Sequence, residues 1–177
     1  MTLRSALRSG LAALLSLHTL LAALPAQAGP HEHGVAHLSV AIDGQHVTLA
    51  FKIPMESLLG YERAPKSPQE QAQAKALLDK LQQGRHLMQL DAQAQCQGPA
   101  PTVRAPVLEG KAASDHSDIE IEWQLQCAQP AMLRKAEVTL FEVAPRLRRV
   151  QAQVAGPQGQ TRKMLRRNLR ELPLQRP

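Results

Sequence analysis

The chain has 177 residues, with 21 lysines and arginines against 15 aspartates and glutamates, seven histidines and two cysteines. Hydrophobic residues make up 44% of the sequence but aromatic residues only 2%, so a core must be built from valine, leucine, isoleucine and alanine. The length supports a single domain with a substantial core. The lack of aromatic residues beside the arginines argues against binding to nucleic acid.

The N-terminus has the pattern of a Sec-type signal peptide. Arg4 and Arg8 precede an apolar run at residues 11–24, and Ala26-Gln27-Ala28 forms a small-x-small cleavage site. We therefore expect cleavage after Ala28, a periplasmic location, and a mature chain without a transmembrane segment. The predicted organisation is a signal peptide at residues 1–28 and a single β-rich domain at residues 29–177 with a basic C-terminal tail.

The mature chain begins with histidines that run directly into a predicted β-hairpin. Apolar residues alternate with polar ones on both sides of Asp43-Gly44, which is the period of half-buried strands. A two-residue type I′ turn at Asp43-Gly44 would pair Val40 with Val47 and keep inward residues opposite inward residues.

The rest of the chain predicts one helix and several further strands. Ser67, Pro68 and Glu70 form a helix start with a capping box, and Gly84 suits the C′ position, so we expect an amphipathic helix over 68–83. Weak or clear strand patterns follow at residues 102–108, 119–127, 136–143, 149–155 and 160–165, and the last ten residues are expected to be frayed. The predicted fold class is α+β, with a mainly antiparallel β-sheet, β-hairpins and one amphipathic helix.

Cys96 and Cys127 are the two cysteines of a chain with an export signal, which predicts a single disulfide between them. Cys127 lies on the inward-facing side of the alternating strand at residues 119–127, which suits a disulfide that faces the core. The alternative, a pair of metal-binding thiolates, is disfavoured by their wide separation and by the oxidising compartment.

Histidines are the main chemical signal. His31 and His33 lie on the same side of an extended chain, and a bend at Gly34 would bring in His37, so these three side chains are candidate metal ligands. Asp115 and His116 form a second group of ligand types in a polar loop. Imidazole suits Zn²⁺, Cu²⁺ and Ni²⁺; the alternative interpretation is a solvated histidine arm.

Other histidine interpretations are weaker. An amino-terminal copper site would need a deprotonated amide at the second mature residue, and Pro30 has no N–H to lose. We interpret His46 and His86 as ordinary surface or boundary residues. No nucleotide-binding, hydrolase or metalloprotease motif occurs, so we expect no enzymatic activity.

The C-terminal part of the chain is strongly basic, with nine lysines and arginines from residue 146 onward against Glu171 alone. Such a segment can contact lipid head groups or another anionic partner. The alternative is that the basic side chains are simply solvated.

The order of several motifs resembles the ZrgA family of zinc-regulated periplasmic proteins. These motifs are His-x-His-Gly-x-Ala-x-Leu at residues 31–38, the Asp-Gly hairpin, Pro-Met-Glu-Ser-Leu-Leu-Gly-Tyr-Glu-Arg-Ala-Pro at 54–65, Trp-Gln-Leu-Gln-Cys at 123–127 and Leu-Phe-Glu-Val-Ala-Pro at 140–145. The resemblance implies a periplasmic zinc-binding protein that assists zinc acquisition beside a zinc ABC importer.

This chain departs from the family in its central loop, the polar segment at residues 109–118. Members of the family carry a long tract rich in histidine and acidic residues in this loop. Here the tract is reduced to Asp115-His116-Ser117-Asp118. If zinc binds, His31, His33 and His37 must supply most of the ligands, joined by His116. The competing hypothesis is an interaction module without metal that uses a sheet edge or the basic tail.

Overall fold

The computed structural model describes residues 32–109 and 117–175. All described residues belong to one compact unit, His31–Pro177. The predicted signal peptide and its cleavage site therefore lie outside the described residues. In the part of the chain that is described, no helix is both long and apolar enough to span a bilayer.

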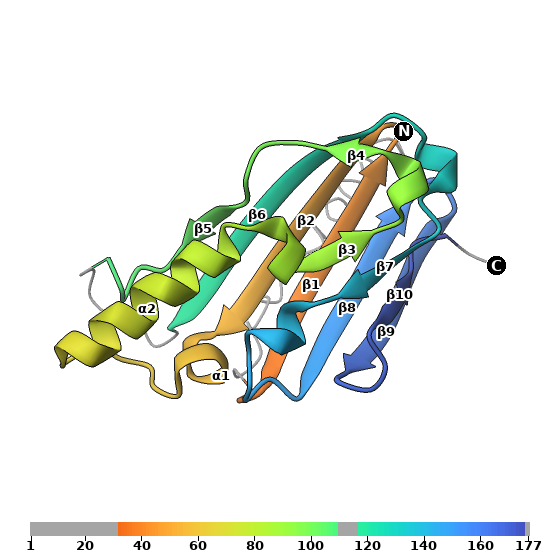
Figure 1. The fold of residues 1–177 in the computed structure, drawn as a ribbon. Helices are drawn as coiled ribbons and strands as arrows, with labels where there is room; N and C mark the ends of the chain where they lie inside the picture. The colour runs from red at the N-terminus through yellow and green to blue at the C-terminus, as the bar shows by residue number, and fades with distance from the viewer. Residues whose placement is uncertain (1–31, 110–116, 176–177) are drawn as a thin grey trace, which may run out of the picture. The chain divides into compact units, whose positions relative to one another are not determined.

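A seven-stranded sheet forms one layer of this unit (Figure 1). Its strands are β1 (Val35–Asp43), β2 (His46–Pro54), β4 (Cys96–Gln97), β5 (Thr102–Arg104), β6 (Asp118–Cys127), β8 (Arg149–Gly156) and β9 (Gly159–Arg166). The strand order is β4-β6-β2-β1-β8-β9, and β5 also pairs with β6. All pairs are antiparallel except β1 and β8, which run parallel.

The second layer covers one face of this sheet (Figure 1). It contains α1 (Met55–Leu59), α2 (Pro68–Leu81), the 3-10 turns η1 (Gly84–His86), η2 (Ala92–Ala94), η3 (Pro130–Met132) and η4 (Leu140–Glu142), and the strands β3 (Met88–Leu90), β7 (Lys135–Val138) and β10 (Glu171–Pro173). These three strands form a small antiparallel sheet in the order β10-β7-β3. The predicted α+β class with mainly antiparallel pairing is confirmed.

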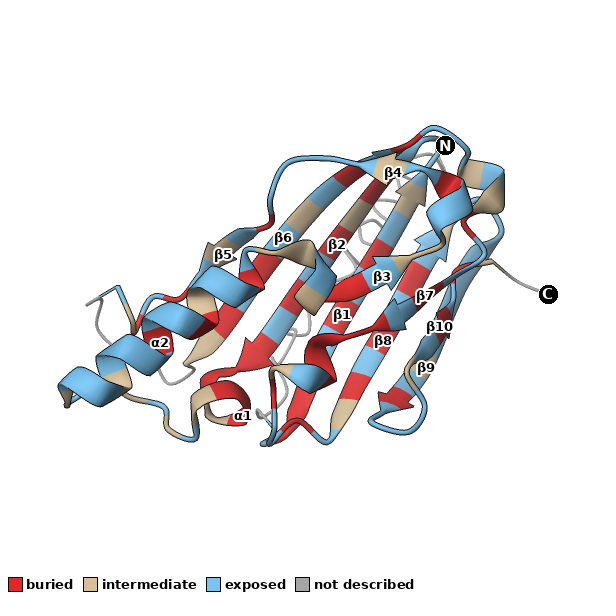
Figure 2. Ribbon diagram, viewed as in Figure 1, coloured by how far each residue is buried: buried red, intermediate tan, exposed pale blue. Residues whose placement is uncertain are grey.

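The core lies between the two layers, and burial alternates along the strands of the large sheet (Figure 2). Leu38, Leu49 and Ile121 on the inner face are at most 2% exposed, and Leu81 of α2 and Phe141 of η4 pack into the same cluster. Alternate residues of β1, β2, β6 and β8 point to the opposite face and are largely exposed. This alternation is the pattern that the sequence predicted.

The predicted register of the β1–β2 hairpin is wrong by two residues. Val40 pairs with Leu49, not with Val47, and Asp43 pairs with His46, so the loop residues are Gly44 and Gln45. Only Gly44 of the two has a positive φ, +55°, which suits the first central position of a type II′ turn. Both registers place inward residues opposite inward residues, so alternation alone could not distinguish them.

The start of α2 is as predicted, but Gly84 has a different role. The Ser67 hydroxyl accepts a hydrogen bond from the N–H of Glu70, whereas the helix ends at Leu81 with Gln82 as its C-cap. Gly84 has no positive φ and begins η1. A Cβ at this position would overlap the indole ring of Trp123, so Gly84 allows a close approach and does not terminate the helix.

Two other expectations about the C-terminal half are corrected. The strand predicted over 136–143 ends at Val138, and the chain then turns into η4, which places Leu140 and Phe141 together in the core. The last ten residues are not frayed throughout, because β10 pairs with β7 and buries Leu172. Leu172 is buried because β10 pairs with β7. The polar residues around Leu172 in the sequence could not indicate this pairing.

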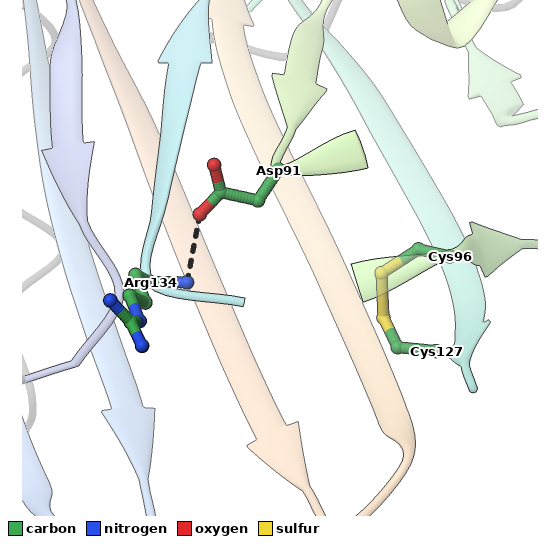
Figure 3. Close-up of a disulfide and its surroundings, with 4 residues drawn as sticks. All are labelled: Asp91, Cys96, Cys127 and Arg134. Atoms are coloured by element: carbon green, nitrogen blue, oxygen red, sulfur yellow. Dashed lines mark hydrogen bonds between the residues drawn. A yellow bond between two sulfur atoms is a disulfide. The ribbon is translucent and has the colours of Figure 1, made fainter. Parts of the chain in front are cut away.

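The predicted disulfide is present. Cys96 and Cys127 are directly opposite each other on β4 and β6, with their Cα atoms 3.8 Å apart (Figure 3). Nearby, a carboxylate oxygen of Asp91 accepts hydrogen bonds from the backbone N–H groups of Arg134 and Lys135, each 2.9 Å long. The segment between β3 and β4 is therefore fastened to both β6 and the start of β7.

Candidate metal site

A tight turn leads the chain into β1 and orients the N-terminal histidine segment. The N–H of Val35 donates to the carbonyl of Glu32 at 3.0 Å, and Gly34 has a φ of +78°, as the third position of a type II turn requires. A Cβ on Gly34 would lie 2.6 Å from Nε of Arg148. Both the backbone angle and the available space therefore demand glycine. The chain bends at Gly34, but His37 continues along β1 and does not join His33 as the prediction required.

This turn places the His33 imidazole between two carboxylates. Its Nδ1 lies 3.7 Å from Oε2 of Glu56 on α1 and 3.7 Å from Oε1 of Glu62 in the segment that follows α1. The His33 side chain is 66% exposed, and the two glutamates are 28% and 41% exposed. The three groups thus form a cluster of one imidazole and two carboxylates that is open to solvent.

Several contacts hold the backbone of this cluster in place. The N–H of Gly34 donates to the Ser57 hydroxyl at 3.1 Å, and Ser57 is completely buried. Arg148 donates to the carbonyl of His33, and Arg149 forms an ion pair with Glu32. The turn is therefore fixed to α1 on one side and to the segment leading into β8 on the other.

Glu62 is held in place through its neighbour Arg63, which contacts α2. The neighbouring Arg63 makes a two-pronged ion pair with Glu70 in the first turn of α2, with N–O distances of 2.9 and 2.8 Å. Together with the N–H of Lys66, this arginine lowers the pKa of the Glu70 carboxyl to about 2. The carboxylate stays ionised near neutral pH and keeps the segment that carries Glu62 attached to the helix.

Ser117, near the end of the central loop, contacts both α1 and Glu62. The carbonyl of Ser117 accepts a hydrogen bond from the N–H of Met55 at 2.9 Å, and the Ser117 hydroxyl donates to the carbonyl of Glu62 at 3.1 Å. Ser117 directly follows the loop segment 110–116 in sequence. The fold therefore brings the end of the second predicted ligand group beside the residues that face His33.

Comparison with known proteins relates this chain to one protein family. A family model described as ZrgA family zinc uptake protein matches residues 30–174. The chain belongs to the ZrgA family. A search of curated proteins found no match. The matched region includes β1, α1, the central loop and the disulfide, so the family relationship covers every element that builds the cluster at His33.

The structure separates the ligands predicted in this ZrgA family member. His33 lies in the cluster, whereas His37 is on the exposed face of β1, where its cross-strand neighbours are Lys52 and Gln151. His31, Asp115 and His116 lie outside the described residues, and their role as ligands stays a prediction.

Sequence reasoning missed Glu56 and Glu62. Both occur in the stretch at residues 54–65 that supported the family resemblance, so a signal was present, but glutamates separated by six positions do not form a ligand motif on their own. In residues 32–109 and 117–175, no group of three or more histidine, cysteine and acidic side chains is arranged to hold a metal ion as it stands.

The buried hydrogen bond from Gly34 to Ser57 yields a direct prediction. Replacing Ser57 with alanine leaves a buried N–H without its acceptor, which should lower the free energy of unfolding by about 1–3 kcal/mol. Urea denaturation measures the change. Ser39→Ala on the exposed face of β1 is the matched control and should stay within about 0.5 kcal/mol of the parent. Equal stability of the two variants would contradict a role for Ser57 in fixing the turn.

Proposed function

We propose that this protein is exported to the periplasm, binds zinc there and assists its uptake without catalysing a reaction. The family match to zinc uptake proteins supports the zinc-related role. The signal-peptide pattern at residues 1–28 supports export. A component of a zinc ABC importer is the partner that we propose would receive the ion.

The observation that carries the proposal is the position of His33 between Glu56 and Glu62. Zinc takes four tetrahedral ligands at about 2.0–2.2 Å, which places any two ligand atoms about 3.4 Å apart. The imidazole nitrogen lies 3.7 Å from each carboxylate oxygen. All three side chains are partly exposed and would have to rotate to surround one ion, because they are not arranged to hold a metal as they stand. Histidine with carboxylates is a ligand set that zinc accepts.

His31 and His116 are the proposed sources of the fourth ligand. His31 precedes Glu32 and His33 by only one and two positions, and His116 is joined directly to Ser117, whose hydroxyl donates to the carbonyl of Glu62. Asp115 is the next candidate along the same loop. We leave His37 out of the proposed set because it lies along β1, between Lys52 of β2 and Gln151 of β8, and not in the cluster at His33.

The exposure of the site suits a protein that delivers its metal. Structural zinc sites are closed by four protein ligands and retain the ion, whereas sites with an open position exchange ligands readily. The His33 side chain is 66% exposed, so a receiving protein could approach the bound ion directly. We therefore propose reversible binding of zinc as cargo.

Zinc-dependent thermal stabilisation tests the proposal. Zinc should raise the thermal midpoint of the mature parent protein, because a ligand that binds only the folded state stabilises it. The variant His33→Ala/Glu56→Gln/Glu62→Gln should lose this shift. The matched control His46→Ala/His86→Ala removes two histidines elsewhere and should keep it. An unchanged shift in the first variant would place the site elsewhere, and no shift in the parent at millimolar zinc would reject zinc binding.

A further inference from the structure

The large sheet ends at β9, an edge strand that pairs with only one described strand. β9 pairs with β8 on one side, and on its other side the only described pairing is the bridge between Arg166 and Leu169. Across Arg162 and Met164 the strand is regular and antiparallel to β8. An edge of this kind offers backbone groups to any chain that can align with it.

The bridge at Arg166 reveals which backbone groups face this open edge. The N–H of Arg166 donates to the carbonyl of Leu169, and the N–H of Leu169 donates back to Arg166, so the backbone groups of Arg166 point away from β8. In an antiparallel strand, residues two apart direct their backbone groups the same way. The N–H and carbonyl groups of Met164 and Arg162 therefore also point outward.

The side chains along this edge are cationic and apolar. β9 carries Arg162, Lys163 and Arg166 and has no acidic residue. Met164 and Leu169 are 37% and 48% exposed and are the large hydrophobic residues that the described surface leaves most open. Met164 and Arg162 also line a hollow on the outer face of the sheet, together with Gln151, Gln153 and Ser39.

We propose that β9 is a docking edge for an extended acidic segment of a partner protein, which would add to the sheet as a further strand. Backbone hydrogen bonds to Arg162 and Met164 would hold the segment, and acidic side chains on the outer face would pair with Arg162 and Arg166. A second copy of this chain does not fit, because pairing two β9 strands would bring their cations together. This inference is independent of zinc binding.

Fluorescence anisotropy with labelled short peptides tests the edge. A peptide that alternates glutamate with valine should bind the full mature chain at least tenfold more tightly than one that alternates lysine with valine. Met164→Pro removes an outward N–H but no bond to β8, so it should weaken binding of the glutamate peptide at least tenfold at an unchanged thermal midpoint. Met164→Ala keeps the N–H and should retain most of the affinity.

A charge-reversed variant keeps the test decisive if the proline variant misfolds. Arg162→Glu/Lys163→Glu should lose the glutamate peptide and gain affinity for the lysine peptide. Equal binding of both peptides by the parent, or full binding by a folded Met164→Pro variant, would overturn the proposal. Binding to vesicles that contain phosphatidylglycerol, unaffected by Met164→Pro and stronger than peptide binding, would also overturn it in favour of a membrane surface.

Discussion

Replacing both Cys96 and Cys127 with alanine should lower the free energy of unfolding by about 3–4 kcal/mol. The disulfide closes a loop with a sequence separation of 31 residues, and in the chain-entropy model a loop of this size contributes about that amount by restricting the unfolded chain. Cys127 is completely buried, so the variant also loses some packing. Guanidinium denaturation of the double variant measures the loss.

Reductant provides the control for this prediction. The parent should lose comparable stability when denatured with reductant present, whereas the double variant should be unaffected by it. The disulfide joins β4 to the last residue of β6, so its loss should loosen β4 and the segment between β3 and β4 most. A double variant within about 1 kcal/mol of the oxidised parent would show that the bridge constrains the unfolded chain much less than the model requires.

Phe141→Ala should cost about 3–5 kcal/mol, because removing a fully buried phenylalanine side chain loses its transfer free energy and leaves a cavity. Phe141 lies in η4 between the two layers, and Arg167 donates to its backbone carbonyl at 2.6 Å, so the backbone remains tied in the variant. The loss should therefore come from packing. Chemical denaturation of parent and variant measures it.

Leu169→Ala is the matched control for Phe141→Ala. Leu169 is 48% exposed, and trimming its side chain should change stability by no more than about 0.5 kcal/mol. If Phe141→Ala cost less than about 1 kcal/mol, η4 would not pack into the core as described, and the path of the chain between β7 and β8 would need revision.

Local signals in the sequence predicted a large part of this fold. Alternation in β6 placed Cys127 on the inner face, and the capping residues at Ser67 and Glu70 located the start of α2. The parallel pairing of β1 with β8 joins residues more than a hundred positions apart, and nothing local encodes it. Leu172 likewise finds its place only through contact with β7.

The candidate site was predictable to a similar extent. His33 was identified from its type and from the glycine that follows it. Glu56 and Glu62 were missed, because their proximity to His33 depends on the end of β2 turning into α1 beside the start of β1. Spacing in the sequence indicates that two residues share a strand face, but it does not indicate which separate segments meet.

Competition titration of zinc against a chromophoric chelator tests the central claim most directly. The purified mature protein should remove zinc from the chelator with a stoichiometry of one ion per chain at neutral pH. Affinity should weaken as the pH is lowered, because zinc binds neutral imidazole and ionised carboxylate. His33→Ala/Glu56→Gln/Glu62→Gln should weaken binding at least tenfold. Undiminished zinc binding by this variant, or no binding by the parent below millimolar zinc, would contradict the proposed site or the proposed function respectively.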